Sequence, residues 1–400
     1  VFDFGPGGGL RPDQRPELKF FHSRTIGLSE TREPIDILAG VKLTGDLKGL
    51  SLGLMDVQTD DFGNSPGSNY SVLRAKKKLF SRSNVGAMAT NRQSSEEGDF
   101  NRTFGVDSNF IFFNNLHLES FFMGSQTPGL EEDDWAARPF RIFWQTDLLL
   151  AAVEHMIIGR TFQADMGFVP RKDMKQSLAE FQFKPRPASE SLRQLEFTSK
   201  LNYIENQEGI LETREQQLGL GVVFESGDQL NFNYTHNFEF LEDGFRLRGQ
   251  LPVPPGSYSS NRFSVNVVPY RGRRISGFFI VQRENGFWEG NRTTTSLNPR
   301  IKWSESLSLQ IQFRLDDVSL PSGKFSSKVS NVGINYNFTN EWLTTTKVQY
   351  DSVQDLVNLN FRINWIYRPG DDLFVVYNQT RRAGQTDRAF ILKFTHSFDF

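Results

Sequence analysis

The sequence repeats one pattern, in which apolar and polar residues alternate over long stretches. In residues 389–400, Phe390, Leu392, Phe394 and Phe398 share one parity, and the other parity is mostly polar. Successive side chains of a strand point to opposite faces, so such a strand has one apolar and one polar face. The same alternation recurs at 195–203, 230–239, 307–315 and 357–367. These stretches exceed the five or six residues usual in soluble strands and match tilted strands that cross a membrane.

The amino-acid composition also favours strands that cross a membrane. Phenylalanine accounts for 38 of 400 residues, yet only 38% of the residues are hydrophobic and the mean hydropathy is −0.45. The longest apolar run, 148–153, is far shorter than the roughly 20 residues that a membrane-spanning helix needs. A closed barrel is the other structure that satisfies every backbone polar group in lipid. The sequence therefore predicts an all-β, transmembrane antiparallel β-barrel.

Other residues exclude several classes of function. With 45 Lys and Arg against 47 Asp and Glu, the net charge of −2 argues against nucleic acid as a partner. The absence of cysteine removes disulfide scaffolds, thiolate catalysis, iron–sulfur clusters and c-type haem. The five histidines lack metal-ligand spacing, and no nucleophile elbow or phosphate-binding loop occurs. We expect no catalytic residues, no cofactor, no metal and no enzymatic activity.

Polar turns suggest how many strands there are. Short turns at 224–230, 303–307, 338–342 and 367–373 carry aromatic or aliphatic residues on both sides, as at the rim of a barrel. Longer polar stretches separate them, at 58–69, 91–103, 124–139, 159–177, 205–215, 241–261, 283–294, 316–327, 351–356 and 379–388. We predict about 22 strands, within a range of 18–24, of which Leu18–Arg24 is the first. Short turns and both termini would be periplasmic, and the longer loops extracellular.

Two segments follow from this pattern. Residues 1–16 are rich in Gly and Pro and are expected to form a periplasmic linker, and residues 17–400 the outer-membrane barrel. The chain begins at Val1 without a signal peptide, so we expect a mature fragment or the ordered part of a longer protein.

A barrel of this width needs something to fill its lumen. Loops that fold inward, a missing domain or a partner protein would fill the lumen. The alternative is that the candidate loops are ordinary solvent-exposed surface loops. The candidate constriction or plug residues are Glu131, Asp133, Trp135, Arg171, Pro254 and Tyr258.

The inward parity of the strands predicts the lumen lining. It comprises Asn231, Asn233, Asn237, Gln310, Gln312, Asn335, Asn358, Asn360, Arg362 and Asn364. Few fixed charges occur among these residues. Amides both donate and accept hydrogen bonds, so an amide-rich lining favours polar, uncharged solutes over ions. The alternative is that Asn is simply common in wet barrel interiors.

Several motifs resemble a known family. They are "FFHSRTIGL" (20–28), "GVKLTGDLKGLSLGLMDVQTDD" (40–61), "VGAMATNR" (85–92), "GFVPR" (167–171) and "FILKFTHSFDF" (390–400). They look like the carboxy-terminal barrel of Gram-negative bacterial proteins known only as a domain of unknown function. In that family the barrel usually follows a domain resembling a carbohydrate-binding module, which this sequence lacks. The ending with Phe398 and Phe400 resembles the carboxy-terminal signal that the barrel-assembly machinery reads.

These observations lead to one main functional hypothesis. We expect a bacterial outer-membrane conduit for polar solutes, with saccharides as candidates, whose lumen is restricted by loops or by a missing domain or partner. The alternative is a structural sheath that holds a partner protein in an envelope complex for secretion, surface attachment or electron conduction. An outer-membrane hydrolase is less favoured. The expected partners are outer-membrane lipid, the barrel-assembly machinery and a periplasmic or surface protein.

Overall fold

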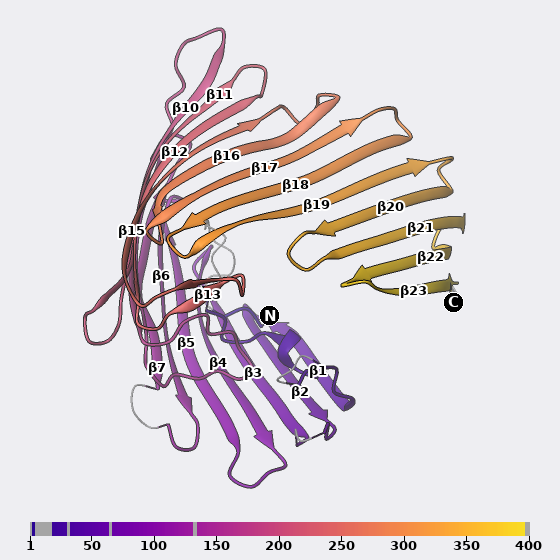
Figure 1. Ribbon diagram of the computed structural model, residues 1–400. Helices are drawn as coiled ribbons and strands as arrows, with labels where there is room; N and C mark the ends of the chain where they lie inside the picture. Colours follow the sequence, from indigo (N-terminus) through magenta and orange to yellow (C-terminus); the bar gives the residue numbers. More distant parts are fainter. Residues whose placement is uncertain (1, 5–17, 30–32, 64–65, 131–133, 397–400) are drawn as a thin grey trace. The chain divides into compact units, whose positions relative to one another are not determined.

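The computed structural model describes residues 2–4, 18–29, 33–63, 66–130 and 134–396. This part of the chain is almost entirely β-structure (Figure 1), with one short 3₁₀ helix, η1 (Ser23–Thr25). None of the helical structure in these residues is long and apolar enough to cross a membrane.

The strands follow one another in chain order. The first nine are β1 (Ile37–Leu47), β2 (Leu50–Thr59), β3 (Ser68–Leu79), β4 (Ser83–Ser94), β5 (Phe100–Phe112), β6 (Leu116–Gln126), β7 (Trp135–Gln145), β8 (Leu149–Ile158) and β9 (Met174–Phe183). The next seven are β10 (Leu192–Glu205), β11 (Leu211–Phe224), β12 (Gln229–Leu241), β13 (Phe245–Leu247), β14 (Leu251–Val253), β15 (Gly256–Val268) and β16 (Ile275–Phe287). The last seven are β17 (Gly290–Lys302), β18 (Leu307–Leu320), β19 (Gly323–Asn337), β20 (Trp342–Asp351), β21 (Leu356–Arg368), β22 (Asp371–Arg382) and β23 (Gln385–Thr395).

The predicted all-β, antiparallel architecture is confirmed. Among the described residues, 21 strands form one sheet, and β13 and β14 form a separate small hairpin. The count lies within the predicted range of 18–24. The prediction of a first strand at 18–24 is wrong, because this segment makes only an isolated bridge from Lys19 to Phe168 and then forms η1. Its apolar side chains, Leu18 and Phe20, are buried in a hydrophobic cluster instead.

The connections match the prediction in only part of the chain. From β1 to β9 short turns alternate with longer connections, at 60–67, 95–99, 127–134 and 159–173. The β9–β10 connection, 184–191, has eight residues. From β10 onward 242–255, which contains β13 and β14, is by far the longest connection, and the others have two to six residues. The stretches 283–294, 316–327 and 379–388 were predicted as longer connections. There the strands continue instead, and only two residues separate β16 from β17, β18 from β19 and β22 from β23.

Side-chain hydroxyl groups close several of the short turns. Ser304 Oγ accepts hydrogen bonds from the backbone N–H groups of Ser306 and Leu307. Thr339 Oγ1 does the same for Glu341 and Trp342. Such bonds satisfy backbone donors that the strand ladder leaves open at a turn. The sequence therefore fixes where these hairpins reverse.

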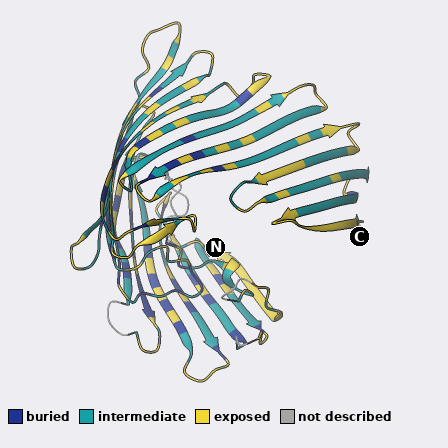
Figure 2. Ribbon diagram, in the orientation of Figure 1, coloured by how far each residue is buried: buried dark blue, intermediate teal, exposed yellow. Residues whose placement is uncertain are grey.

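Contacts divide the chain into two compact units. The first unit contains Val1–Gln182 and Lys200–Arg214, and the second contains Phe183–Ser199 and Glu215–Phe400. In both units buried or half-buried positions alternate with exposed positions along many strands (Figure 2). The two faces of the sheet in each unit thus differ in exposure.

Candidate functional site

The second unit brings all the predicted lining residues onto one face of its sheet, which we call the polar face. Directly opposed residues on neighbouring strands share a face. Register connects β12 to β18 through the pairs Asn233–Ser264, Ser264–Gln282, Gln282–Thr294 and Thr294–Asp316. It continues to β21 through Gln310–Gly333, Gly333–Lys347 and Lys347–Asn360. The predicted residues of β12, β18, β19 and β21 therefore form one continuous surface.

An unbroken row of neutral polar side chains crosses this face. It runs from β18 to β22 through Gln312, Asn331, Gln349, Asn358 and Thr380, each directly opposite the next. Asn331 Nδ2 donates to Gln312 Oε1 across 3.4 Å. In the neighbouring row, Asn360 Nδ2 donates to Asn378 Oδ1 across 2.5 Å. We call the first of these rows the amide row. It offers both donors and acceptors to a solute along five consecutive strands.

The polar face also carries charges that strand parity alone did not single out. Glu284 is paired with Arg292 at 2.7 Å, and Asp316 with Arg314 at 2.7 Å. Both carboxylates accept further hydrogen bonds, from Ser260 to Glu284 and from Thr294 to Asp316. The expectation of a lining with few fixed charges is therefore incomplete: a band of paired charges lies beside the neutral amide row.

The opposite face of the second unit is apolar and exposed. Phe263, Val281 and Leu392 point away from the polar face and have 53%, 51% and 64% of their surface accessible. Near the turns at 338–341 and 369–370 this face carries a chain of contacting aromatic rings. Trp342 stacks on Trp365 with ring centroids 5.3 Å apart, and the chain continues through Tyr367 and Phe394.

The connection 242–255 folds over one end of the polar face. Tyr258 and Leu320, both on the polar face, are buried in a cluster with Val253. The Tyr258 hydroxyl donates to the Pro254 carbonyl across 2.7 Å, and Ser322 Oγ donates to the Pro252 carbonyl across 3.0 Å. Pro254 of this connection and Tyr258 of β15, two of the predicted constriction residues, are thus in direct contact.

In the first unit, chain segments from outside the sheet cover one face, which we call the covered face. Val72, Met88 and Met123 of that face pack with Phe20 from the segment before β1 and with Phe162 from the β8–β9 connection. Phe162 has no accessible surface, and Met166 has 1%. The opposite face is exposed and apolar, with Phe104, Val106 and Phe122 among its residues.

Two glycines allow this close packing. A Cβ on Gly105 would lie 2.8 Å from Phe4 and 3.0 Å from Phe20, so the bare backbone makes room for both rings. A Cβ on Gly167 would lie 2.4 Å from the Lys19 carbonyl oxygen. Close contact lets Lys19 and Phe168 exchange two backbone hydrogen bonds, at 2.9 and 2.8 Å. Phe4 stacks on Phe20 at 4.5 Å. Residues 2–4 therefore pack on the covered face, whereas residues 5–16 of the predicted linker lie outside the described residues.

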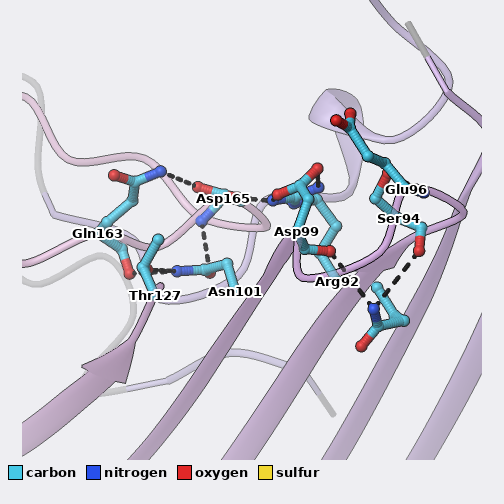
Figure 3. A network of polar contacts seen from close by, with 9 residues as sticks. Arg92, Ser94, Glu96, Asp99, Asn101, Thr127, Gln163 and Asp165 are labelled. Carbon is cyan, nitrogen blue, oxygen red and sulfur yellow. Dashed lines mark hydrogen bonds and ion pairs between the residues drawn. The ribbon is translucent and has the colours of Figure 1, made fainter. Parts of the chain in front are cut away.

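A polar network fastens the covering loop to the sheet (Figure 3). Arg92 of β4 donates to Asp165 at 2.7 Å and forms a two-pronged bond to Asp99, at 2.5 and 2.8 Å. Asn101 of β5 accepts from the Asp165 backbone N–H at 3.0 Å and donates to the Gln163 carbonyl at 3.0 Å. The pKa of Asp99, in the 95–99 loop, is lowered chiefly by its hydrogen bond from Arg92. We call these residues the loop latch.

A buried layer of ion pairs lies on the same covered face. Arg74 donates to both carboxylate oxygens of Asp107, at 2.5 and 2.9 Å. Arg141 bridges Glu119 at 3.2 Å and Glu154 at 3.4 Å, and Glu154 also pairs with Arg138. Buried charges are costly unless paired, and here each one has a partner of opposite charge within 3.4 Å. The lining prediction missed them. The alternation of Thr103, Gly105 and Asp107 with Phe104 and Val106 was a signal that could have revealed Asp107.

The other predicted plug residues are not brought together. Glu131 and Asp133 lie outside the described residues, as do Phe398 and Phe400 of the carboxy-terminal signal. Trp135 lies on the exposed apolar face, where its ring is stacked 6.4 Å from that of Phe122, so it does not fit the predicted constriction. Arg171 lies near the end of the β8–β9 connection and forms an ion pair with Glu212 at the start of β11.

No protein-family model matches the sequence, and no curated protein matches it. Among solved structures, the open form of the ferric-catecholate import receptor Fiu from E. coli K12 is similar, at 8% sequence identity and a TM-score of 0.39. That match covers 88% of this chain and 71% of the receptor chain. Within the described residues, no group of three or more His, Cys, Asp or Glu side chains is arranged to hold a metal ion.

Proposed function

We propose that this protein is an outer-membrane β-barrel conduit for neutral polar solutes, saccharides among them. The amide row carries the proposal, because it offers hydrogen bonds along five consecutive strands while the opposite face of the same sheet is apolar. A solute that keeps exchanging hydrogen bonds with such a row loses little on leaving water.

The apolar faces support a membrane location. A soluble sheet covers its apolar face with other protein, whereas here large apolar side chains remain exposed on strands of both units. The stacked rings near the short turns are typical of the aromatic girdle of an outer-membrane barrel. We infer that the end of the strands that carries the turns at 225–228, 303–306, 338–341 and 369–370 faces the periplasm, and that the barrel-assembly machinery inserts the chain.

The folded-in segments support a restricted lumen. The β8–β9 connection covers part of the first unit, and the 242–255 connection covers one end of the polar face of the second. The covered face of the first unit is thus occupied by the chain itself. This favours a self-restricted conduit over a sheath whose lumen holds another protein.

A transport assay with matched variants tests the proposal. The purified protein is reconstituted into liposomes, and swelling is followed in neutral sugars of increasing size. Replacing Asn331, Gln349 and Asn358 together by Leu should slow swelling several-fold, because the amide row loses its hydrogen bonds. The matched control replaces the adjacent apolar-face residues Val332, Val348 and Val357 by Leu. Its rate should stay close to that of the wild type.

Two results would contradict the proposal. Folded wild-type protein that permits neither swelling nor ion conductance in planar bilayers is not an open conduit. Equal rates in the polar-face and apolar-face triple variants would show that solutes do not follow the amide row.

A further inference from the structure

A pocket of about 690 Å³ lies at one end of the second unit, beside the connection 242–255. The β13–β14 hairpin forms one wall, and the β16–β17 and β18–β19 turns form the other. Phe245, Tyr258 and Trp288 contribute aromatic lining, and Arg246, Glu289 and Ser322 contribute polar groups. The conduit proposed above does not by itself require such a pocket.

Trp288 is the centre of the aromatic lining. Its ring meets that of Tyr258 edge to face, with centroids 4.9 Å apart and an interplanar angle of 79°. It meets Phe245 in the same way, at 5.4 Å and 79°. Edge-to-face contacts from two directions hold the indole in a defined orientation. The aromatic surface is thus fixed before any ligand arrives.

The backbone at Trp288 is unusual. Trp288 and Glu289 form the β16–β17 turn with φ values of +48° and +63°. The comparable turns at Lys48–Gly49, Arg248–Gly249 and Ala383–Gly384 place glycine at the second position, and the turn at Phe113–Asn114 places asparagine there, which tolerates this conformation better than glutamate. A side chain in this left-handed region costs about 1–2 kcal/mol, and such strain is concentrated at functional sites. Here the strained turn presents one aromatic and one acidic side chain to the same pocket.

Hydrogen bonds also preform the pocket. Arg246 donates to the carbonyl oxygen of Gln250 across 3.1 Å, which holds its guanidinium against its own hairpin. Ser322 Oγ donates to the Pro252 carbonyl and joins the β18–β19 turn to the hairpin wall. Both walls are thereby tied to each other rather than left as independent loops.

The chemistry of the lining selects a class of ligand. Arg246 supplies donors and Glu289 supplies acceptors, so an ion of either sign would meet a charge of its own sign as well as one of the opposite sign. A sugar ring has an apolar face that packs on an aromatic ring and hydroxyl groups that both donate and accept. We propose that this pocket binds a neutral saccharide on Trp288, as a loading site beside the polar face. The proposal names the solute of the conduit described above and in that respect rests on it.

Direct binding measurements test this assignment. The full chain in detergent is titrated calorimetrically with maltohexaose, cellohexaose and xylohexaose, and with choline chloride as a cationic comparison. At least one hexasaccharide should bind. Trp288→Leu should weaken that binding by ten-fold or more, and Glu289→Gln should weaken it several-fold. Trp303→Leu is the matched control, because Trp303 also lies at a turn of the second unit but is exposed and is not part of the pocket. The affinity of this variant should equal that of the wild type.

Several results would overturn the saccharide assignment, and they can be distinguished from a failure of the proposed conduit. Absence of binding by all three sugars, binding of choline alone, or sugar binding that Trp288→Leu leaves unchanged would each overturn the assignment. Trp288→Gly, which relieves the left-handed backbone, guards against misfolding as the cause of a loss: it should fold stably and still lose binding. If liposomes swell normally but sugar binding does not depend on Trp288, the pocket fails and the conduit stands. If sugar binds through Trp288 but nothing permeates, the conduit fails and the pocket stands.

Discussion

Arg92 Nε lies 2.7 Å from Asp165 Oδ2, and this bond joins two residues that are 73 positions apart in the sequence. It fastens the β8–β9 connection to strand β4 at the edge of the covered face. Phe162 and Met166, on the same connection, bury their side chains against that face. The loop latch therefore holds in place a segment whose apolar residues would otherwise meet water.

The first prediction concerns the latch. Arg92→Met should destabilise the docked loop by about 1–3 kcal/mol, because two carboxylates lose a charged hydrogen-bond donor. Hydrogen exchange of residues 162–169 should become faster, while exchange in β16–β18 should not change. Arg102→Met is the control, since Arg102 is exposed on the other face of the neighbouring strand β5. Equal exchange in Arg92→Met and wild type would show that apolar packing alone holds the loop.

The second prediction is a pH dependence. The pKa of Asp99 is lowered by its hydrogen bond from Arg92, so this carboxylate stabilises the fold at pH values above its unfolded pKa, about 4. The stabilisation is lost as pH falls through the lower folded-state pKa. Because 42% of the Asp99 side chain is exposed, the effect should not exceed about 1 kcal/mol. Asp99→Asn should be less stable than wild type at pH 7, and the difference in melting temperature should shrink below about pH 4. A constant difference from pH 7 to pH 3 would contradict this assignment.

The third prediction concerns the buried ion pair. The side chains of Arg74 and Asp107 are 0% and 2% exposed, so Asp107→Asn leaves a buried guanidinium without its paired charge. We expect a loss of about 3–5 kcal/mol in the free energy of unfolding. The double variant Arg74→Met with Asp107→Leu should lose less, because it removes both charges. Glu225→Gln, which breaks the exposed pair with Arg193, should change stability by about 0–1 kcal/mol. A double variant less stable than Asp107→Asn would show that the pair is a net source of stability.

Local patterns predicted which amide residues of the second unit share one face, but they misplaced several strand ends. Alternation is a property of each strand alone, and neighbouring strands joined by short turns keep their parity in register. Asn233 and Asn360 therefore share a surface although no single strand contains both. Several strands end in polar residues, and these residues were wrongly predicted to form longer connections. The residues of 316–327 are polar on both parities at several positions, so alternation fades while backbone pairing continues through the β18–β19 turn.

The covered face could not be predicted in the same way. It depends on contacts between distant segments, such as Lys19 with Phe168 and Asn101 with Gln163. The segment before β1 has apolar residues spaced like those of a strand, and only its docking partner shows that it does not pair with β1. Trp288 gave no sequence signal either, because its role in the pocket depends on a turn conformation and on the hairpin 245–253 that folds against it.

The fourth prediction assigns the two faces of the second unit, and the absence of cysteine makes it easy to test. Single cysteines are placed at Phe232 and Asn233, which are adjacent on β12 but lie on opposite faces. In intact outer membranes, Asn233→Cys should react with a small water-soluble maleimide, because its face lines an aqueous lumen. Phe232→Cys should be protected by lipid and should react only after the protein is moved into detergent.

A second pair of cysteines tests the orientation of the strands. Glu305→Cys lies in the short β17–β18 turn, and Gly249→Cys lies in the hairpin of the 242–255 connection, at the opposite end of the strands. If the end that carries the 303–306, 338–341 and 369–370 turns is periplasmic, a bulky maleimide that cannot cross the outer membrane should label Gly249→Cys on whole cells. Glu305→Cys should be labelled only after the cells are opened. If Glu305→Cys is labelled on whole cells and Gly249→Cys only after the cells are opened, the topology is inverted. For the first pair of cysteines, equal reactivity of Phe232→Cys and Asn233→Cys in membranes would argue against a lipid-facing sheet.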